Sequence, residues 1–165
     1  MESTAQQIRE YIIRPTLREM DLWSQAAEHL LIGTAAHESN GFRAIHQYGS
    51  GPALSWYQIE PATHDDLWLN TMPGLRKRLP RAGLVLEGMV ARRYQGTPPQ
   101  PPSEYLLHNL VYATAICRLL YWRAPGALPG ADDLAGLAAY WKKFYNTAAG
   151  AGRESDWLDA YAEYC

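Results

Sequence analysis

The stretch GTAAHESNGF, residues 33–42, places a carboxylate at the end of an apolar helical pattern. Glu38 follows small apolar residues and comes just before Asn40-Gly41, a pair typical of a helix end. Burial and the negative end of the helix dipole both favour the protonated carboxyl group. A glutamic acid that stays protonated near neutral pH can act as a general acid. The alternatives are a solvated carboxylate at a frayed helix end and an ion pair with Arg43.

A helix beginning at Pro15 is predicted to position this carboxylate. Proline fits the first turn of a helix, and apolar side chains then recur at steps of three and four residues. The stripe consists of Met20, Trp23, Ala27, Leu31 and Thr34. Because Glu38 comes about five whole turns after Met20, the pattern places its side chain on the same apolar face.

The segment after Glu38 is predicted to be a small hairpin or an irregular lobe. Gly49, Gly51 and Pro52 are turn residues, and residues 54–59 form a short aromatic and apolar run. A helix follows, capped by Thr63 or Asp65.

The rest of the chain is predicted to form helices joined by turns. A helix is expected over about residues 81–94, followed by a Pro-rich connector, GTPPQPPS, within the same domain. The next helix has Ser103 as its cap and Pro125 as its stop, and its apolar body predicts the central buried helix. Two more helices are predicted over residues 132–147, with Asp residues in the first turn, and 154–164.

The composition of the chain indicates how many domains it forms and which partners and cofactors to expect. A chain of 165 residues with 47% hydrophobic content is expected to form one domain, residues 1–165. A net charge of −2 gives no electrostatic reason to expect nucleic acid or an anionic membrane as a partner. With no signal-peptide pattern, we expect synthesis in a cytoplasm. Cys117 and Cys165 lack metal or disulfide spacing, and no metal or cofactor is expected.

Three motifs resemble the soluble lytic transglycosylases, which have a lysozyme-like fold. That family has a Glu-Ser pair ending a helix, then Gly-Leu-Met-Gln-x-x-Pro-x-Thr, then an alanine-rich helix running into Tyr-Asn-Ala-Gly. The corresponding stretches here are Glu38-Ser39, ALSWYQIEPAT at 53–63 and LAAYWKKFYNT at 137–147. Order and rough spacing agree over about residues 33–148. The combination of GPALSWYQIEPATHDD and YWKKFYNT is also similar to small lysozyme-like proteins of tailed bacteriophages.

The resemblance implies a mainly α, lysozyme-like α+β fold with a minor irregular or β-hairpin element after the catalytic glutamate. It implies cleavage of the β-1,4 bond between N-acetylmuramic acid and N-acetylglucosamine in peptidoglycan, with Glu38 as the single acid and base. By the same resemblance, the substrate-binding residues are Ser39, Ser55, Tyr57, Gln58, Tyr145 and Asn146, and the aromatic faces of Trp56 and Tyr57 are offered to sugar rings.

The phage likeness implies a protein made in the host cytoplasm that acts on glycan strands in the periplasm or cell wall. Its role is then host wall degradation during genome delivery or lysis, as an endolysin or as a virion component beside other virion proteins.

Two alternatives stay open. Ser55 stands where the family has glycine, and a positive φ or a close sugar approach at this position would make Ser55 strain the turn or narrow the cleft. This departure favours a catalytically inactive, structural virion protein. In contrast, Glu60 or the Asp65-Asp66 pair, placed across from Glu38, would position a water molecule and make the protein a true muramidase.

Overall fold

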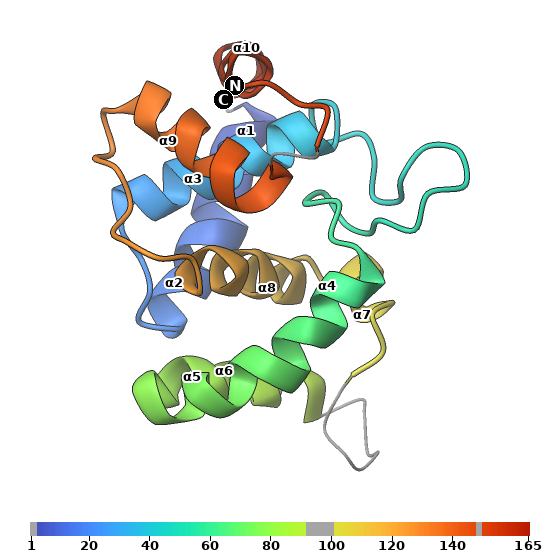
Figure 1. The fold of residues 1–165 in the computed structure, drawn as a ribbon, viewed down its shortest axis with the longest axis vertical. Coiled ribbons are helices and arrows are strands. Elements are labelled where there is room, and N and C mark those ends of the chain that lie inside the picture. Colours follow the sequence, from blue (N-terminus) through green and yellow to red (C-terminus); the bar gives the residue numbers. More distant parts are fainter. Residues whose placement is uncertain (1–2, 92–100, 148–149) are drawn as a thin grey trace.

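The computed structural model describes residues 3–91, 101–147 and 150–165, and these residues are mainly helical (Figure 1). The first half contains α1 (Thr4–Ile8), η1 (Arg9–Ile13), α2 (Arg14–Glu19), α3 (Gln25–Glu38), α4 (Pro61–Asp66), η2 (Leu67–Thr71), α5 (Met72–Arg78) and α6 (Pro80–Ala91). The second half contains α7 (Tyr105–His108), α8 (Leu110–Trp122), α9 (Leu134–Trp141), η3 (Lys142–Asn146) and α10 (Glu154–Tyr164). The η elements are single π-helical stretches that continue the neighbouring α-helices.

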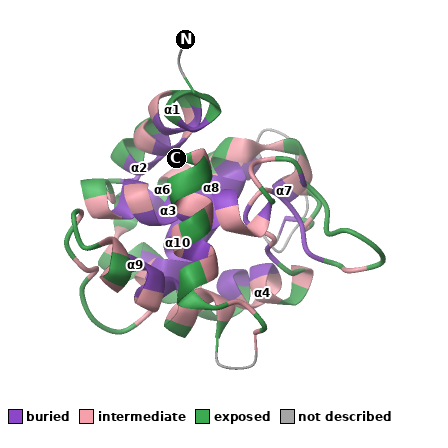
Figure 2. Cartoon of the chain, turned by 90° about the horizontal axis from the view of Figure 1, so that it is seen from above, coloured by how far each residue is buried: buried purple, intermediate pink, exposed green. Residues whose placement is uncertain are grey.

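Helix α8 lies at the centre of the molecule, as its apolar sequence predicts. It contacts α2, α3, α6 and η3, and it separates the layer of α3 and α9 from the layer of α4, α5 and α6 (Figure 1). Every residue from Tyr112 to Tyr121 is buried, and the buried positions are concentrated on α3 and α8 (Figure 2). Burial of this apolar area is the main favourable contribution to folding.

The helix predicted from Pro15 to Glu38 is wrong as a single element, because the chain turns between α2 and α3. Asp21 adopts a left-handed conformation with φ 59°, which a continuous helix does not allow. Ser24 then caps α3 by accepting a hydrogen bond of 3.1 Å from the Ala27 amide. Trp23, placed on the apolar stripe by the pattern, lies in this turn and is 41% exposed. The end of the helix at Glu38 is confirmed.

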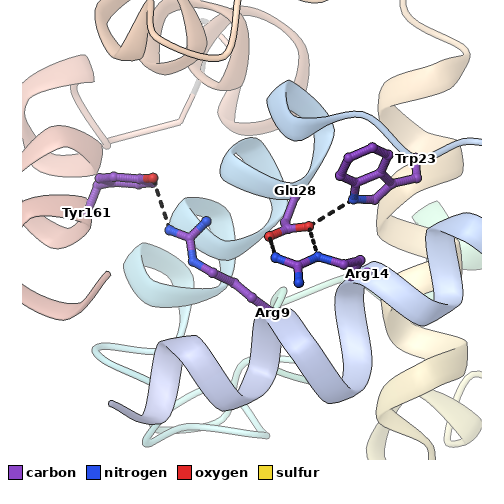
Figure 3. Close-up of polar contacts among 5 residues, drawn as sticks. All are labelled: Arg9, Arg14, Trp23, Glu28 and Tyr161. Carbon is purple, nitrogen blue, oxygen red and sulfur yellow. Dashed lines mark hydrogen bonds and ion pairs between the residues drawn. The ribbon is translucent and has the colours of Figure 1, made fainter. Parts of the chain in front are cut away.

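The segments η1 and α2 are fixed to the rest of the fold by two arginines (Figure 3). Arg14 makes two hydrogen bonds to the buried carboxylate of Glu28, at 3.0 and 2.9 Å, and Trp23 donates a third of 2.8 Å. Burial alone would raise the pKa of Glu28, but these bonds and the charge of Arg14 outweigh it and lower the pKa. Arg9 donates to Tyr161 of α10 across 3.0 Å. The polar contacts thus join residues near both ends of the chain.

Three predicted helix starts are corrected. Helix α4 begins at Pro61 after Glu60, so Thr63 and Asp65 lie inside the helix instead of capping it. The helix expected from Ser103 is two helices, and Asn109 caps α8 by accepting from the Tyr112 amide at 3.0 Å. In α9, Asp133 is the cap rather than a first-turn residue.

Helix α8 ends at Trp122, before Pro125. The Pro-rich connector and the end of the helix predicted to residue 94 lie largely outside the described residues.

The segment predicted as irregular or β is a lobe without regular strands in its described residues 39–60. Two isolated antiparallel bridges, His46 with Leu54 and Leu54 with Ile59, hold it together. Among the described helices of the whole chain, none is both long and apolar enough to cross a bilayer.

Candidate active site

Glu38 lies in the last turn of α3, with its carboxyl group held by a residue far along the chain. Trp141, fully buried at the end of α9, donates its indole Nε1–H to Glu38 Oε1 across 3.1 Å. The Trp141 ring is itself fixed by an edge contact with His37, with ring centroids 4.6 Å apart. Within the described residues, no ion pair reaches Glu38, and Arg43 instead lies over the Tyr164 ring at 6.0 Å.

Burial raises the pKa of Glu38 from 4.5 to about 7, and the hydrogen bond from Trp141 opposes part of that rise. A group with this pKa is present in both protonation states near neutral pH. It can therefore donate a proton in one step and accept one in the next. The prediction of a partly buried carboxyl group that favours its protonated form is confirmed.

Gln58 is presented by a tight turn in the irregular lobe. Leu54 and Ile59 exchange two backbone hydrogen bonds of 2.9 Å, which close the turn. Ser55 and Gln58 both have positive φ, 67° and 47°. The Gln58 side chain donates Nε2–H to Ser55 O across 2.8 Å, which leaves Oε1 as its second polar atom. Two unusual backbone conformations thus place this amide.

Tyr145 and Asn146 come from η3, which continues α9 beyond Trp141. The Tyr145 hydroxyl donates to Tyr57 O across 2.6 Å, so η3 is bonded to the turn that carries Gln58. The Tyr145 ring stacks on buried Tyr121 of α8, with centroids 5.2 Å apart. Burial raises the pKa of the Tyr145 phenol well above its ordinary value, so this side chain stays neutral.

These residues line two hollows that share four residues, and the two hollows together form the cleft. A hollow of about 570 Å³ is lined by Glu38, Gln58, Tyr145 and Asn146, together with Ala44, Gln47, Tyr48, Ala53, Glu60 and Gly150. A second hollow of about 380 Å³ shares Gln58, Glu60, Tyr145 and Asn146 and extends to Thr63, Leu120, Arg123 and Phe144. Both volumes fall in the range of about 300–1,000 Å³ usual for ligand sites. The cleft therefore has room for an extended ligand.

Three residues predicted to bind substrate do not reach the cleft. Ser39 and Ser55 are both 0% exposed and Tyr57 is 1% exposed. The Ser39 hydroxyl donates to Ala35 O and accepts from the Phe42 amide, so it closes the helix end. Their predicted contact with substrate is corrected, because each hydroxyl is used inside the protein.

The other two buried hydroxyls hold the turn that carries Gln58. Ser55 accepts from the Tyr57 amide at 3.2 Å, and the Tyr57 hydroxyl bonds Thr114 at 2.9 Å. Trp56, suggested as a face for sugar rings, packs its ring against Phe42 with centroids 5.9 Å apart. These side chains hold the residues that line the cleft in place and do not line it themselves.

Sequence reasoning missed several lining residues. Tyr48 is 69% exposed on the lobe, and an aromatic residue beside Gly49-Ser50-Gly51 was a usable signal for a rim position. Arg123 and Phe144 line the far end of the cleft, and nothing in their local sequence marks them. Their placement depends on how α8 and η3 pack.

Comparisons with protein-family models, with curated proteins and with solved structures give no match to this chain. Within the described residues, no group of three or more His, Cys, Asp or Glu side chains is placed to hold a metal ion.

Proposed function

We propose that the protein is a lysozyme-like, phage-encoded lytic transglycosylase that cleaves peptidoglycan with Glu38 as its acid and base. The observation that carries the proposal is the carboxyl group of Glu38, which opens on the cleft and has a pKa raised to about 7. The sequence resemblance supports the choice of substrate. The lining by Gln58, Tyr145 and Asn146 supports it further, because the three matched motifs meet at one cleft.

In the proposed reaction, protonated Glu38 gives its proton to the oxygen that leaves C1 of N-acetylmuramic acid. The carboxylate then takes the proton of the C6 hydroxyl, whose oxygen bonds to C1. The C1–O bond to N-acetylglucosamine breaks, a 1,6-anhydro ring forms, and Glu38 ends protonated as it began. The substrate's acetamido group stabilises the positive charge that develops at C1, and Gln58 and Asn146 orient that group through hydrogen bonds.

A muramidase is the second candidate, and Glu60 favours it. This exposed carboxylate lines both parts of the cleft, which supports a role in positioning water. Hydrolysis would then leave a reducing end instead of an anhydro ring. The third candidate is an inactive virion protein. Ser55 favours it, because serine replaces the family glycine at a position with φ 67°, which glycine adopts without strain.

The products that the protein releases from purified peptidoglycan distinguish the three candidate functions. We expect mass spectrometry to find 1,6-anhydromuramic ends after treatment with the wild-type chain. Reducing ends would establish the muramidase. No release from sacculi that a control lysozyme digests would contradict both enzymatic proposals and leave the structural role.

A further inference from the structure

Lys142, the first residue of η3, uses all three of its ammonium protons inside one short segment. Its Nζ donates to Asn146 Oδ1 at 2.7 Å, to Thr147 O at 2.9 Å and to Gly150 O at 2.9 Å. The two carbonyl groups lie on either side of residues 148–149. One cation thus joins both sides of this segment to the end of η3.

The same contact decides which way the Asn146 amide is turned. An ammonium group only donates, so the atom of Asn146 that faces Lys142 must be the carbonyl oxygen Oδ1. Nδ2 is then the amide atom on the opposite side, and Asn146 lines both parts of the cleft. Oδ1 is taken by Lys142, and among the described residues Nδ2 makes no hydrogen bond, so the donor is the amide atom left for a ligand.

Two glycines allow the chain to close around this amide. A Cβ added at Gly150 would lie 2.4 Å from Asn146 Oδ1, and one added at Gly152 would lie 3.1 Å from Nδ2. The first distance is far inside normal contact, so a side chain at Gly150 would displace the amide. The close approach of the two glycines and the hydrogen bond from Lys142 together restrict the Asn146 side chain.

We propose that Lys142 is a positioning residue that holds the Asn146 amide with Nδ2 toward the cleft, where it donates to a carbonyl or hydroxyl oxygen of the ligand. The inference rests on the proposed function for the identity of that ligand, a glycan that carries acetamido groups. The orientation of the amide rests on the three hydrogen bonds alone. The family motif gives Lys142 no role, because within the matched stretch 137–147 it names only the alanines and the Tyr145-Asn146 pair.

The experiment compares Lys142→Met with Lys143→Met, a matched change at the neighbouring exposed lysine whose Nζ lies 5.1 Å from the Phe144 ring. NMR first follows two signals of the unliganded chain, the side-chain amide of Asn146 and the Gly150 N–H that bonds Thr147 O at 3.2 Å. In Lys142→Met we expect the Asn146 signal to move to that of a solvated amide. We expect Gly150 exchange to rise on the order of tenfold, because a charged hydrogen bond is lost. Both signals should stay unchanged in Lys143→Met.

Binding of an N-acetylglucosamine tetrasaccharide then tests the donor. Asn146→Asp keeps the oxygen that faces Lys142 and removes Nδ2. It should leave Gly150 exchange slow and lower the affinity about tenfold, as Lys142→Met does. Unchanged NMR signals in Lys142→Met would overturn the inference, and so would wild-type affinity in Asn146→Asp. If the wild type binds no tetrasaccharide, both the proposed glycan ligand and the donor role of Asn146 are contradicted. The NMR signals still decide separately whether Lys142 holds the Asn146 amide.

Discussion

Trp141 and Glu38 are 103 residues apart in the sequence and are joined by a hydrogen bond of 3.1 Å. The bond fixes one carboxyl oxygen and opposes the rise in pKa that burial causes. It therefore links the packing of α9 on α3 to the protonation state of the candidate acid. Any change in this contact should appear in the pH dependence of the site.

Trp141→Phe should raise the pKa of Glu38 above about 7, because it removes the donor that stabilises the carboxylate and keeps an aromatic ring. Activity should shift to higher pH, and stability should fall by about 1–3 kcal/mol. NMR titration of Glu38 measures the first effect. Trp157→Phe is the matched control, since Trp157 is also fully buried but its Nε1 has no partner among the described residues. Equal Glu38 pKa values in wild type and Trp141→Phe would show that the bond has no such effect.

Glu38 should make the free energy of unfolding depend on pH. Its folded pKa, about 7, is above its ordinary value of 4.5, so the folded protein binds the proton more tightly than the unfolded chain. The stability from this group is complete below pH 4.5 and is lost as the pH rises through 7. The difference in stability between wild type and Glu38→Gln should therefore fall by about 3 kcal/mol over this range. Urea unfolding from pH 4 to 8 measures it, and parallel curves would contradict the prediction.

Ser55 has φ 67° and accepts a hydrogen bond from the Tyr57 amide. Ser55→Gly removes the strain of the left-handed conformation together with the hydroxyl, so the two effects should nearly cancel. Ser55→Ala keeps the Cβ and loses the bond. We expect the glycine variant to be more stable than the alanine variant by about 1 kcal/mol. Thermal unfolding of the two proteins checks this, and greater stability of Ser55→Ala would show that the turn carries no strain.

Tyr48→Ala should weaken substrate binding, because this exposed ring lies on the rim of the cleft. We expect KM to rise with kcat unchanged, and stability to change by less than about 0.5 kcal/mol. Tyr11→Ala is the matched control, since Tyr11 on η1 is 66% exposed and does not line the cleft. Equal KM values in the two variants would remove Tyr48 from the site.

The end of α3 could be predicted because its signals are local. Asn40 and Gly41 adopt left-handed conformations, as the residue types indicate, and the carboxyl group of Glu38 is partly buried as expected. The break before α3 could not be predicted in the same way. It depends on a left-handed Asp21, a residue type that also occurs inside helices. Met20 and Glu38 therefore do not lie on one continuous helix, although the side chain of Glu38 is partly buried as the pattern predicts.

The residues that line the cleft could also be predicted only in part from the local sequence. Gln58, Tyr145 and Asn146 were found through motifs, and all three line it. Ser39, Ser55 and Tyr57 belong to the same motifs but are buried, and their hydroxyl groups form hydrogen bonds inside the protein. Arg123 and Phe144 join the cleft only through the packing of α8 against η3, which no local pattern reports.

The most direct test of the central claim compares two carboxylates of the same cleft. Release of muropeptides from purified peptidoglycan is measured for wild type, Glu38→Gln and Glu60→Gln, with the fold of each variant checked by its unfolding transition. We predict that Glu38→Gln lowers the rate on the order of 10²–10⁴-fold, because the acid and base is lost. Glu60→Gln should stay close to the wild-type rate. Release by Glu38→Gln at the wild-type rate would contradict the role of Glu38 as acid and base.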